Sequence, residues 1–297
     1  MNWQRDMENT LQVNDPLPHS RAGWTEGLSA NGRVNYVQQG KGMPVILTHG
    51  MAASLHDWDD LLPELSGSGF AGYALDLLGH GDSHKPAHYN EYTADSVFAH
   101  FEAWVSGLQL DEPMVLIGHS LGAGLSLRYA SRYPDRVRAL VLSNPFYEFR
   151  QLPLLLRTTL IRRLLHTRLL ENTPYHLFRF FVDLTSFSFH VRQRKAHILP
   201  EPIRHRTAVD YRRSSSGIYN IPRTLPNLTA DLSRILQPTL LLWGARDTTL
   251  ARASFPQLAK SLPNVAGTHI LPICGHVPHQ CHPAIFNPYV MSFLRAL

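Results

Sequence analysis

A serine, an aspartate and a histidine in this sequence could together carry out nucleophilic catalysis. Ser120 lies in the pentapeptide GHSLG (residues 118–122), between the apolar run 114–117 and a helix-like stretch over 121–133. A serine between two glycines at a strand-to-helix turn is the pattern of a nucleophile elbow, which exposes the hydroxyl above a sheet. Because a serine hydroxyl is a weak nucleophile, this chemistry also needs a base and an acid that orients the base.

The base and the acid are expected directly after other apolar runs. Asp247 follows the run 239–243, and His276 follows the run 268–273. The carboxyl ends of parallel strands lie at one edge of a sheet, so side chains that follow such runs meet there. The sequence therefore predicts a triad of Ser120, Asp247 and His276, in that order along the chain.

The elements that would position this triad follow an alternating pattern before residue 145 and after residue 227. Short runs that are apolar throughout are typical of strands buried on both faces of a parallel sheet, and their alternation with helices indicates an α/β fold. The pair Asn31-Gly32 predicts a hairpin and hence an antiparallel edge. The apolar runs are 45–48, 73–75, 114–117, 137–142 and 239–243, and the helix-like stretches are 56–65, 92–108 and 121–133.

The composition is that of a folded protein without a membrane-spanning helix. The chain has 297 residues, of which 44% are hydrophobic, enough for one large core with a smaller inserted unit. No apolar stretch approaches the roughly 18 residues of a membrane span, and the first twenty residues lack the pattern of a secretory signal. Two cysteines, Cys274 and Cys281, fit a reducing compartment, and the sequence leaves open whether they are bridged. We therefore expect a cytoplasmic protein.

Residues 145–226 interrupt the alternation and carry the basic charge. This segment has fourteen Arg or Lys against five acidic residues, whereas the rest of the chain has an excess of acids. Its Leu-, Phe- and Pro-rich composition predicts a mostly helical insertion. Residues 152–170 contain ten Leu or Ile and four Arg, which would allow a weak contact with lipid or a membrane surface, but packing on the core with snorkelling arginines is the favoured interpretation. No nucleic-acid-binding module accompanies the arginines, so no nucleic-acid partner is expected.

Further motifs stand around the predicted triad in a fixed order. They are HGM (residues 49–51), DLLGHGDS (76–83), the run and acid at 238–247, and GHVP (275–278). With the elbow, they resemble the successive motifs of the α/β-hydrolase fold family, over residues 33–144 and 227–297. The resemblance implies a mostly parallel twisted sheet with helices on both faces.

The same resemblance implies a division of the chain and an oxyanion hole. Residues 1–144 and 227–297 would form the α/β-hydrolase core, and residues 145–226 would form an inserted helical cap. The backbone N–H groups of Met51 and Leu121 would form the oxyanion hole. Asp76 is the competing acid, but the turn that it begins would be structural. Some family members keep their acid at the position that Asn144 occupies in this chain. Asp247 is therefore the predicted acid.

Other polar residues receive structural interpretations. His49 and His119 are expected to pack or bond beneath the site, and Asp57, Asp59 and Asp60 are expected at the start of a helix, where acids suit the helix dipole. A metal site is the rival interpretation of the C-terminal histidine region, but prolines at 278 and 283 prevent a helix from presenting its histidines on one face. No metal and no cofactor are therefore predicted. The potential ligands in that region are Cys274, His276, His279, Cys281 and His282.

A serine nucleophile points to acyl transfer. We expect hydrolysis of a small, apolar carboxylic ester, with lactones and thioesters as close alternatives. Family members that open epoxides or cleave carbon–halogen bonds attack with a carboxylate, and members that cleave carbon–carbon bonds often have Trp after the catalytic histidine, where this chain has Val277. A lyase or carbon–carbon hydrolase using the same triad, and a ligand receptor with little turnover, remain as alternatives. The sequence does not specify the oligomeric state.

Overall fold

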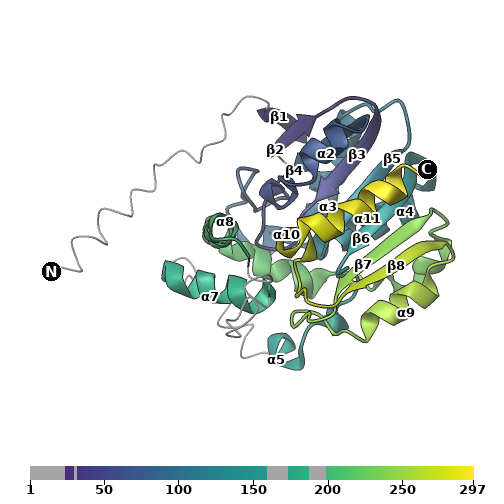
Figure 1. Cartoon of the computed structure of the whole chain (residues 1–297). Helices are drawn as coiled ribbons and strands as arrows, with labels where there is room; N and C mark the ends of the chain where they lie inside the picture. The colour runs from purple at the N-terminus through teal and green to yellow at the C-terminus, as the bar shows by residue number, and fades with distance from the viewer. Residues whose placement is uncertain (1–23, 30–31, 159–172, 187–198) are drawn as a thin grey trace.

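An eight-stranded sheet forms the centre of the protein (Figure 1). The computed structural model describes residues 24–29, 32–158, 173–186 and 199–297. The strands are β1 (Trp24–Ser29), β2 (Gly32–Gln39), β3 (Met43–Thr48), β4 (Phe70–Leu75), β5 (Met114–His119), β6 (Val137–Ser143), β7 (Thr239–Gly244) and β8 (Val265–Leu271). Their spatial order is β1-β2-β4-β3-β5-β6-β7-β8. The pairs from β4 to β8 are parallel, which confirms the predicted mostly parallel α/β sheet.

The N-terminal hairpin forms the antiparallel edge that the sequence predicts. β1 pairs antiparallel with β2 in a register that places Ser29 opposite Gly32, and β2 pairs antiparallel with β4. The turn residues 30–31 lie outside the described residues.

Alternation along the strands divides the apolar side chains between two cores, one on each face of the sheet. Leu116 of β5 belongs to the core that contains residues of α3 (Ala94–Gly107), α4 (Leu121–Arg132) and α9 (Ser254–Ser261). Its neighbours Val115 and Ile117 belong to the other core, which contains residues of α2 (Leu62–Ser66) and α11 (Pro283–Leu294). Successive side chains of a strand point to opposite faces, so a strand covered on both sides is apolar throughout.

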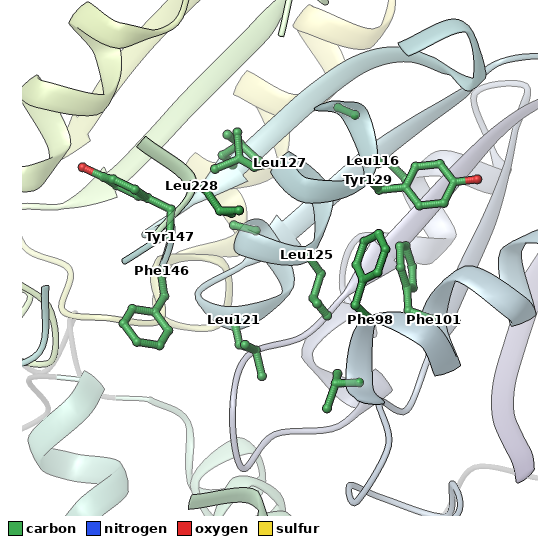
Figure 2. Packing of buried hydrophobic residues seen from close by; sticks show 14 of the residues in the cluster. Phe98, Phe101, Leu116, Leu121, Leu125, Leu127, Tyr129, Phe146, Tyr147 and Leu228 are labelled. Carbon is green, nitrogen blue, oxygen red and sulfur yellow. The ribbon is translucent and has the colours of Figure 1, made fainter. Parts of the chain in front are cut away.

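The first core joins α3 and α4 through aromatic rings. Figure 2 shows Phe98 and Phe101 of α3 beside Tyr129 of α4. The rings of Phe101 and Tyr129 meet edge to face, with their centroids 5.6 Å apart. This packing fixes α4, whose first turn follows Ser120, against the sheet.

The single helix predicted over 56–65 is wrong. Residues Leu55–Trp58 form a 3-10 helix, η1, and α2 begins only at Leu62. Pro63 has no N–H group to donate to the carbonyl four residues earlier, so it is tolerated in the first turn of a helix and not in the middle of one. The stretches predicted at 92–108 and 121–133 correspond to α3 and α4.

The described parts of residues 145–226 are helical and contain no strand. They include α5 (Leu154–Arg157), α7 (Tyr175–Ser186), α8 (Glu201–Arg213) and the 3-10 segment η6 (Ser216–Thr224). Arg204 of α8 forms a two-bond ion pair with Asp183 of α7, at 2.5 and 2.8 Å. Most of the helix expected over 152–170 lies outside the described residues, and the cap boundaries stay a prediction.

Two further findings concern the membrane and the cysteines. Within the described part of the chain, no helix is both long and apolar enough to cross a membrane. Cys274 and Cys281 are free thiols, and both are buried.

Candidate active site

Ser120 lies at a sharp turn between β5 and α4. Its φ of 50° and ψ of −113° place it in a region that residues with a Cβ rarely adopt. The turn is held by four backbone hydrogen bonds, since the Ser120 N–H donates to the carbonyl of Ser143 at 2.9 Å and its carbonyl accepts from the N–H groups of Ala123, Gly124 and Phe146. A Cβ at Gly122 would overlap the carbonyl oxygen of Thr48, so α4 can approach the end of β3 only with glycine there.

The structure brings the three predicted residues together. The His276 Nε2 atom lies 3.0 Å from the Ser120 Oγ, and the His276 Nδ1 atom lies 2.8 Å from the Asp247 Oδ2. A carboxylate accepts, so Nδ1 carries the proton and Nε2 is free to accept from the serine hydroxyl. Ser120, Asp247 and His276 are buried, and they come from the loops after β5, β7 and β8 respectively. This is the geometry of a nucleophile, a base and an orienting acid.

Four donors hold the Asp247 carboxylate. His276 and the Asn144 side chain donate to Oδ2, the latter at 2.7 Å, and the backbone N–H groups of Thr249 and Leu250 donate to Oδ1 at 2.7 and 3.0 Å. Burial alone would raise the pKa of Asp247, but the charge and hydrogen bond of His276, with the other donors, outweigh burial and hold that pKa below its usual value. Asp247 is therefore a stable anion.

Asn144 takes a part in this arrangement that the sequence does not predict. By sequence it only occupies the place of an absent acid, whereas its side chain bridges Asp247 and the N–H group of Gly244, which donates to its Oδ1 at 3.3 Å. The signal was present, because Asn144 follows β6 and β6 pairs with β7, the strand before Asp247. Two polar residues that end neighbouring parallel strands are expected to meet.

The backbone of His276 is fixed on both sides. Its N–H group donates to the carbonyl of Thr185 in α7, at 2.8 Å, and its carbonyl accepts from the Nε2 of His119, at 2.7 Å. The segment predicted to form the cap thus contacts the candidate base directly. Nothing in the sequence pattern indicated the contact with Thr185.

The predicted oxyanion residues lie beside the nucleophile. An ideal Cβ on Gly50 would be 3.2 Å from the Ser120 Cβ, so the loop containing Met51 touches the elbow. Among the described residues, no group accepts from the backbone N–H of Met51 or of Leu121. These two N–H groups could therefore donate to a substrate oxygen, and that role stays a prediction.

The structure agrees with the structural roles expected for His49 and Asp76. His49 accepts from the Leu77 N–H at Nε2, at 3.0 Å, and donates from Nδ1 to the Gly50 carbonyl, at 2.6 Å. His49 therefore links the loop that contains Gly50 and Met51 to the chain that follows β4. The competing acid Asp76 accepts from Leu55 N–H, Asn35 Nδ2 and Asp82 N–H, so its carboxylate ties loops together and does not contact His276.

The environment of Asp57 differs from the one expected for an acid at the start of a helix. It does lie in the first turn of η1, but it is buried and its carboxylate faces His279, with the Oδ2 3.4 Å from the His279 Nε2. Burial of Asp57 depends on α10 (Pro278–Cys281), which is more than 200 residues away in the sequence and packs against η1. The sequence pattern of η1 contains no sign of that contact.

The sheet, the elbow and the three facing side chains together define a class of protein, the α/β-hydrolase fold. A family model described as "alpha/beta hydrolase fold" matches residues 43–283, and the chain belongs to that family. The chain is similar to epoxide hydrolase 3 of Xenopus tropicalis, with 26% identity over 93% of this chain and 78% of that protein. It is also similar to a haloalkane dehalogenase of Agrobacterium fabrum, with 32% identity, but the match spans only 47% of this chain and 46% of that protein.

The fold is also that of solved esterase structures. A thermophilic esterase from Thermogutta terrifontis matches with a TM-score of 0.76 and 20% sequence identity, over 92% of this chain and 98% of that chain. At this identity the likeness concerns the fold.

Proposed function

We propose that this protein is a serine hydrolase that cleaves carboxylic esters through Ser120, His276 and Asp247. The observation that carries the proposal is the continuous path of hydrogen bonds from the Ser120 Oγ through the His276 ring to Asp247, at 3.0 and 2.8 Å. In this arrangement His276 takes the Ser120 proton as the hydroxyl attacks an acyl carbon, and Asp247 stabilises the imidazolium that forms.

A serine nucleophile favours an ester as the substrate over the epoxides and haloalkanes after which the relatives in sequence are named. Enzymes of this family that open epoxides or cleave carbon–halogen bonds attack with a carboxylate, and position 120 is a serine here. A serine attack forms a tetrahedral intermediate, whose oxyanion would accept from the N–H groups of Met51 and Leu121. The intermediate collapses and expels the alcohol, which takes its proton from His276, and the acyl group stays on Ser120. Water, deprotonated by His276, then attacks the acyl carbon and releases the acid, and the proton returns to Ser120. Lactones and thioesters react by the same steps.

The neighbours of Ser120 favour an apolar substrate. Leu121 follows Ser120 directly, Phe146 donates its N–H to the Ser120 carbonyl, and both are buried apolar residues. We propose that residues 145–226 act as the cap that covers this substrate, since Thr185 of α7 contacts His276.

A fluorophosphonate probe tests the nucleophile. Wild-type protein is expected to be labelled at Ser120, and Ser120→Ala and His276→Ala are expected to lose labelling. Ser126→Ala is the matched control, because it removes another buried hydroxyl, one that donates to the Gly122 carbonyl, lies 3.5 Å from the Thr48 Oγ1 and makes no hydrogen bond with His276. Labelling that survives at full rate in His276→Ala would contradict the proposal.

A panel of nitrophenyl esters with acyl chains of increasing length then tests the reaction. Turnover by wild-type protein that is lost in Ser120→Ala is the expected result, with short chains preferred. A wild-type protein that takes the probe but turns over no ester, lactone or thioester would refute ester hydrolysis while leaving the nucleophile in place.

A further inference from the structure

Three buried side chains converge behind His276, outside the path that the proposed reaction uses. Asp57 comes from η1, His119 from the end of β5, and His279 from α10. Their solvent-exposed fractions are 8%, 3% and 3%. The Asp57 Oδ2 lies 3.4 Å from the His279 Nε2 and 3.9 Å from the His119 Nδ1, and all three atoms lie within 4.8 Å of one another.

These three atoms share an unusual property. Within the described part of the chain, none of the Asp57 Oδ2, the His119 Nδ1 and the His279 Nε2 has a hydrogen-bond partner. A buried polar atom without a partner is unfavourable, and native proteins contain few of them. Three that face one another therefore point to a ligand that would satisfy all three at once.

The hydrogen bond on the far side of His119 determines which atom faces the cluster. Its Nε2 lies 2.7 Å from the His276 carbonyl oxygen, which only accepts, so Nε2 carries the proton. The Nδ1 then presents a lone pair. A histidine that binds a metal usually donates its other N–H to a carbonyl or carboxylate in this way.

The carboxylate is held in the same manner. Gln280 donates from Nε2 to the Asp57 Oδ1 at 2.5 Å, which leaves Oδ2 directed at the two rings. His279 is fixed by stacking on Trp58, with ring centroids 4.9 Å apart and an interplanar angle of 26°. Asp57 and His119 are thus held by hydrogen bonds from outside the cluster, as the ligands of a metal site are, whereas His279 is held by stacking and its Nδ1 has no partner among the described residues.

We propose that Asp57, His119 and His279 form a binding site for a divalent metal ion of the kind that nitrogen and oxygen ligands bind together, such as Zn²⁺. Two imidazoles and a carboxylate suit Zn²⁺, whereas Mg²⁺ and Ca²⁺ prefer oxygen ligands alone. Bonds of about 2.0–2.1 Å in a tetrahedron separate the ligand atoms by about 3.4 Å. The distance from the Asp57 Oδ2 to the His279 Nε2 already has this value, whereas the distance from Asp57 to His119 would shorten from 3.9 Å and that from His119 to His279 from at most 4.8 Å.

A cavity lies next to this site and touches Asp57, but neither His119 nor His279 lines it. It has a volume of about 220 Å³, lies between η1 and α8, and is lined by Asp57 and Gln280 among others. A cation could reach Asp57 from this cavity, and a water from the cavity could supply the fourth ligand. This site differs from the one that the sequence suggested as a rival, because it uses neither cysteine and shares only His279 with that set.

The bound cation would act on the candidate base through His119. The ring of His119 would connect the cation to the His276 carbonyl, so binding would stiffen the backbone that carries the base. That consequence rests on the proposed function, whereas binding of the cation does not.

Isothermal calorimetry on untagged, chelator-treated protein tests the site with Zn²⁺ alone. One tight site is expected in wild-type protein. Asp57→Asn and His279→Gln each remove one ligand, and each is expected to weaken binding more than the roughly 10- to 100-fold that loss of an outer partner causes. His176→Gln, an exposed histidine on α7, is the matched control and should bind as wild type does. Equal affinity in all four proteins would overturn the proposal, as would the absence of a tight wild-type site.

Cobalt spectroscopy gives a readout that needs no variant to fold. Wild-type protein with Co²⁺ is expected to show the visible absorption of low-coordinate cobalt bound to nitrogen and oxygen. A thiolate-to-cobalt charge-transfer band would instead assign the metal to Cys274 and Cys281 and refute the proposal. Neither measurement depends on ester hydrolysis, so failure of the metal site and failure of the proposed function are distinguishable.

Discussion

Asn144→Gly is expected to slow the reaction although Asn144 has no direct contact with Ser120 in the proposed mechanism. The Asn144 Nδ2 donates to the Asp247 Oδ2 at 2.7 Å, to the same oxygen that faces His276. Glycine removes this donor and accommodates the backbone, whose φ is 43°. The change therefore removes the two contacts of the side chain, with Asp247 and with the Gly244 N–H, without straining the backbone.

The size of the effect follows from the charge of the acceptor. A hydrogen bond to a charged group contributes about 1.5–3 kcal/mol. In the proposed mechanism Asp247 is needed most in the transition state, when His276 becomes an imidazolium. If the whole contribution is lost there, kcat/KM falls about 10- to 150-fold, at 1.36 kcal/mol for each factor of ten.

The pH dependence gives an independent check on the same residue. Donors to the charged form hold the pKa of Asp247 below its usual value, so removal of one donor raises that pKa. The variant then begins to protonate Asp247 at a pH at which the wild type keeps the charge. Its activity relative to wild type is therefore expected to fall further as the pH is lowered from about 7 to about 5.

The assay is nitrophenyl ester hydrolysis across this pH range, with fluorophosphonate labelling of Ser120 as a second rate. Gln109→Gly is the matched control, because it introduces glycine at another left-handed position, with a φ of 49°, at an exposed site beyond α3. The reasoning is refuted if Asn144→Gly and Gln109→Gly share the wild-type kcat/KM and pH profile.

Three other changes test the site and the packing around it. Asp247→Asn should lower kcat about 10 000-fold, since the amide favours the wrong histidine tautomer, and a loss below tenfold in ester hydrolysis would exclude Asp247 as the orienting acid. Burial raises the pKa of Asp210 to about 7, from about 3.9 in the unfolded chain, so wild-type stability is expected to fall as pH rises between these values. Asp210→Asn lacks that loss. Between about pH 4 and about pH 8, its free energy of unfolding in urea should therefore rise relative to that of wild type by up to about 4 kcal/mol. If the difference in unfolding free energy between the two proteins stays constant over this pH range, the raised pKa of Asp210 is contradicted. Gly124→Ala places a Cβ against the Phe146 carbonyl oxygen and should destabilise by about 1–3 kcal/mol in thermal unfolding, whereas Gly107→Ala, which meets open space, should be neutral or stabilising.

The strands and the triad could be predicted from the sequence because both depend on local pattern. The apolar run 114–117, followed by GHSLG, specifies a buried strand, a tight turn and a helix within about twenty residues, and β5 (Met114–His119) and α4 (Leu121–Arg132) lie there, with ends one or two residues from those predicted. Asp247 and His276 were found by a topological rule, since the carboxyl ends of parallel strands share an edge. That rule needs the order of the elements and no detail of packing.

The helix over 56–65 shows where local pattern was misleading. Its apolar spacing suits a helix, but Pro63 prevents the hydrogen bond that would join η1 to α2. The proline was visible in the sequence, so this error was avoidable.

Only the tertiary structure decided which polar groups share an environment. Asp57 is an ordinary helix-start acid by sequence, and it is buried because α10, more than 200 residues later, packs on η1 and brings His279 to its carboxylate. The contact of the Thr185 carbonyl with the His276 N–H likewise joins α7 to a loop after β8. Periodicity reports which face of an element is buried, because burial of a face is a property of one element. Which partner it meets depends on how several elements pack, and so Ser120, Asp247 and His276 could be named from the sequence, while the environment of Asp57 and His119 could not.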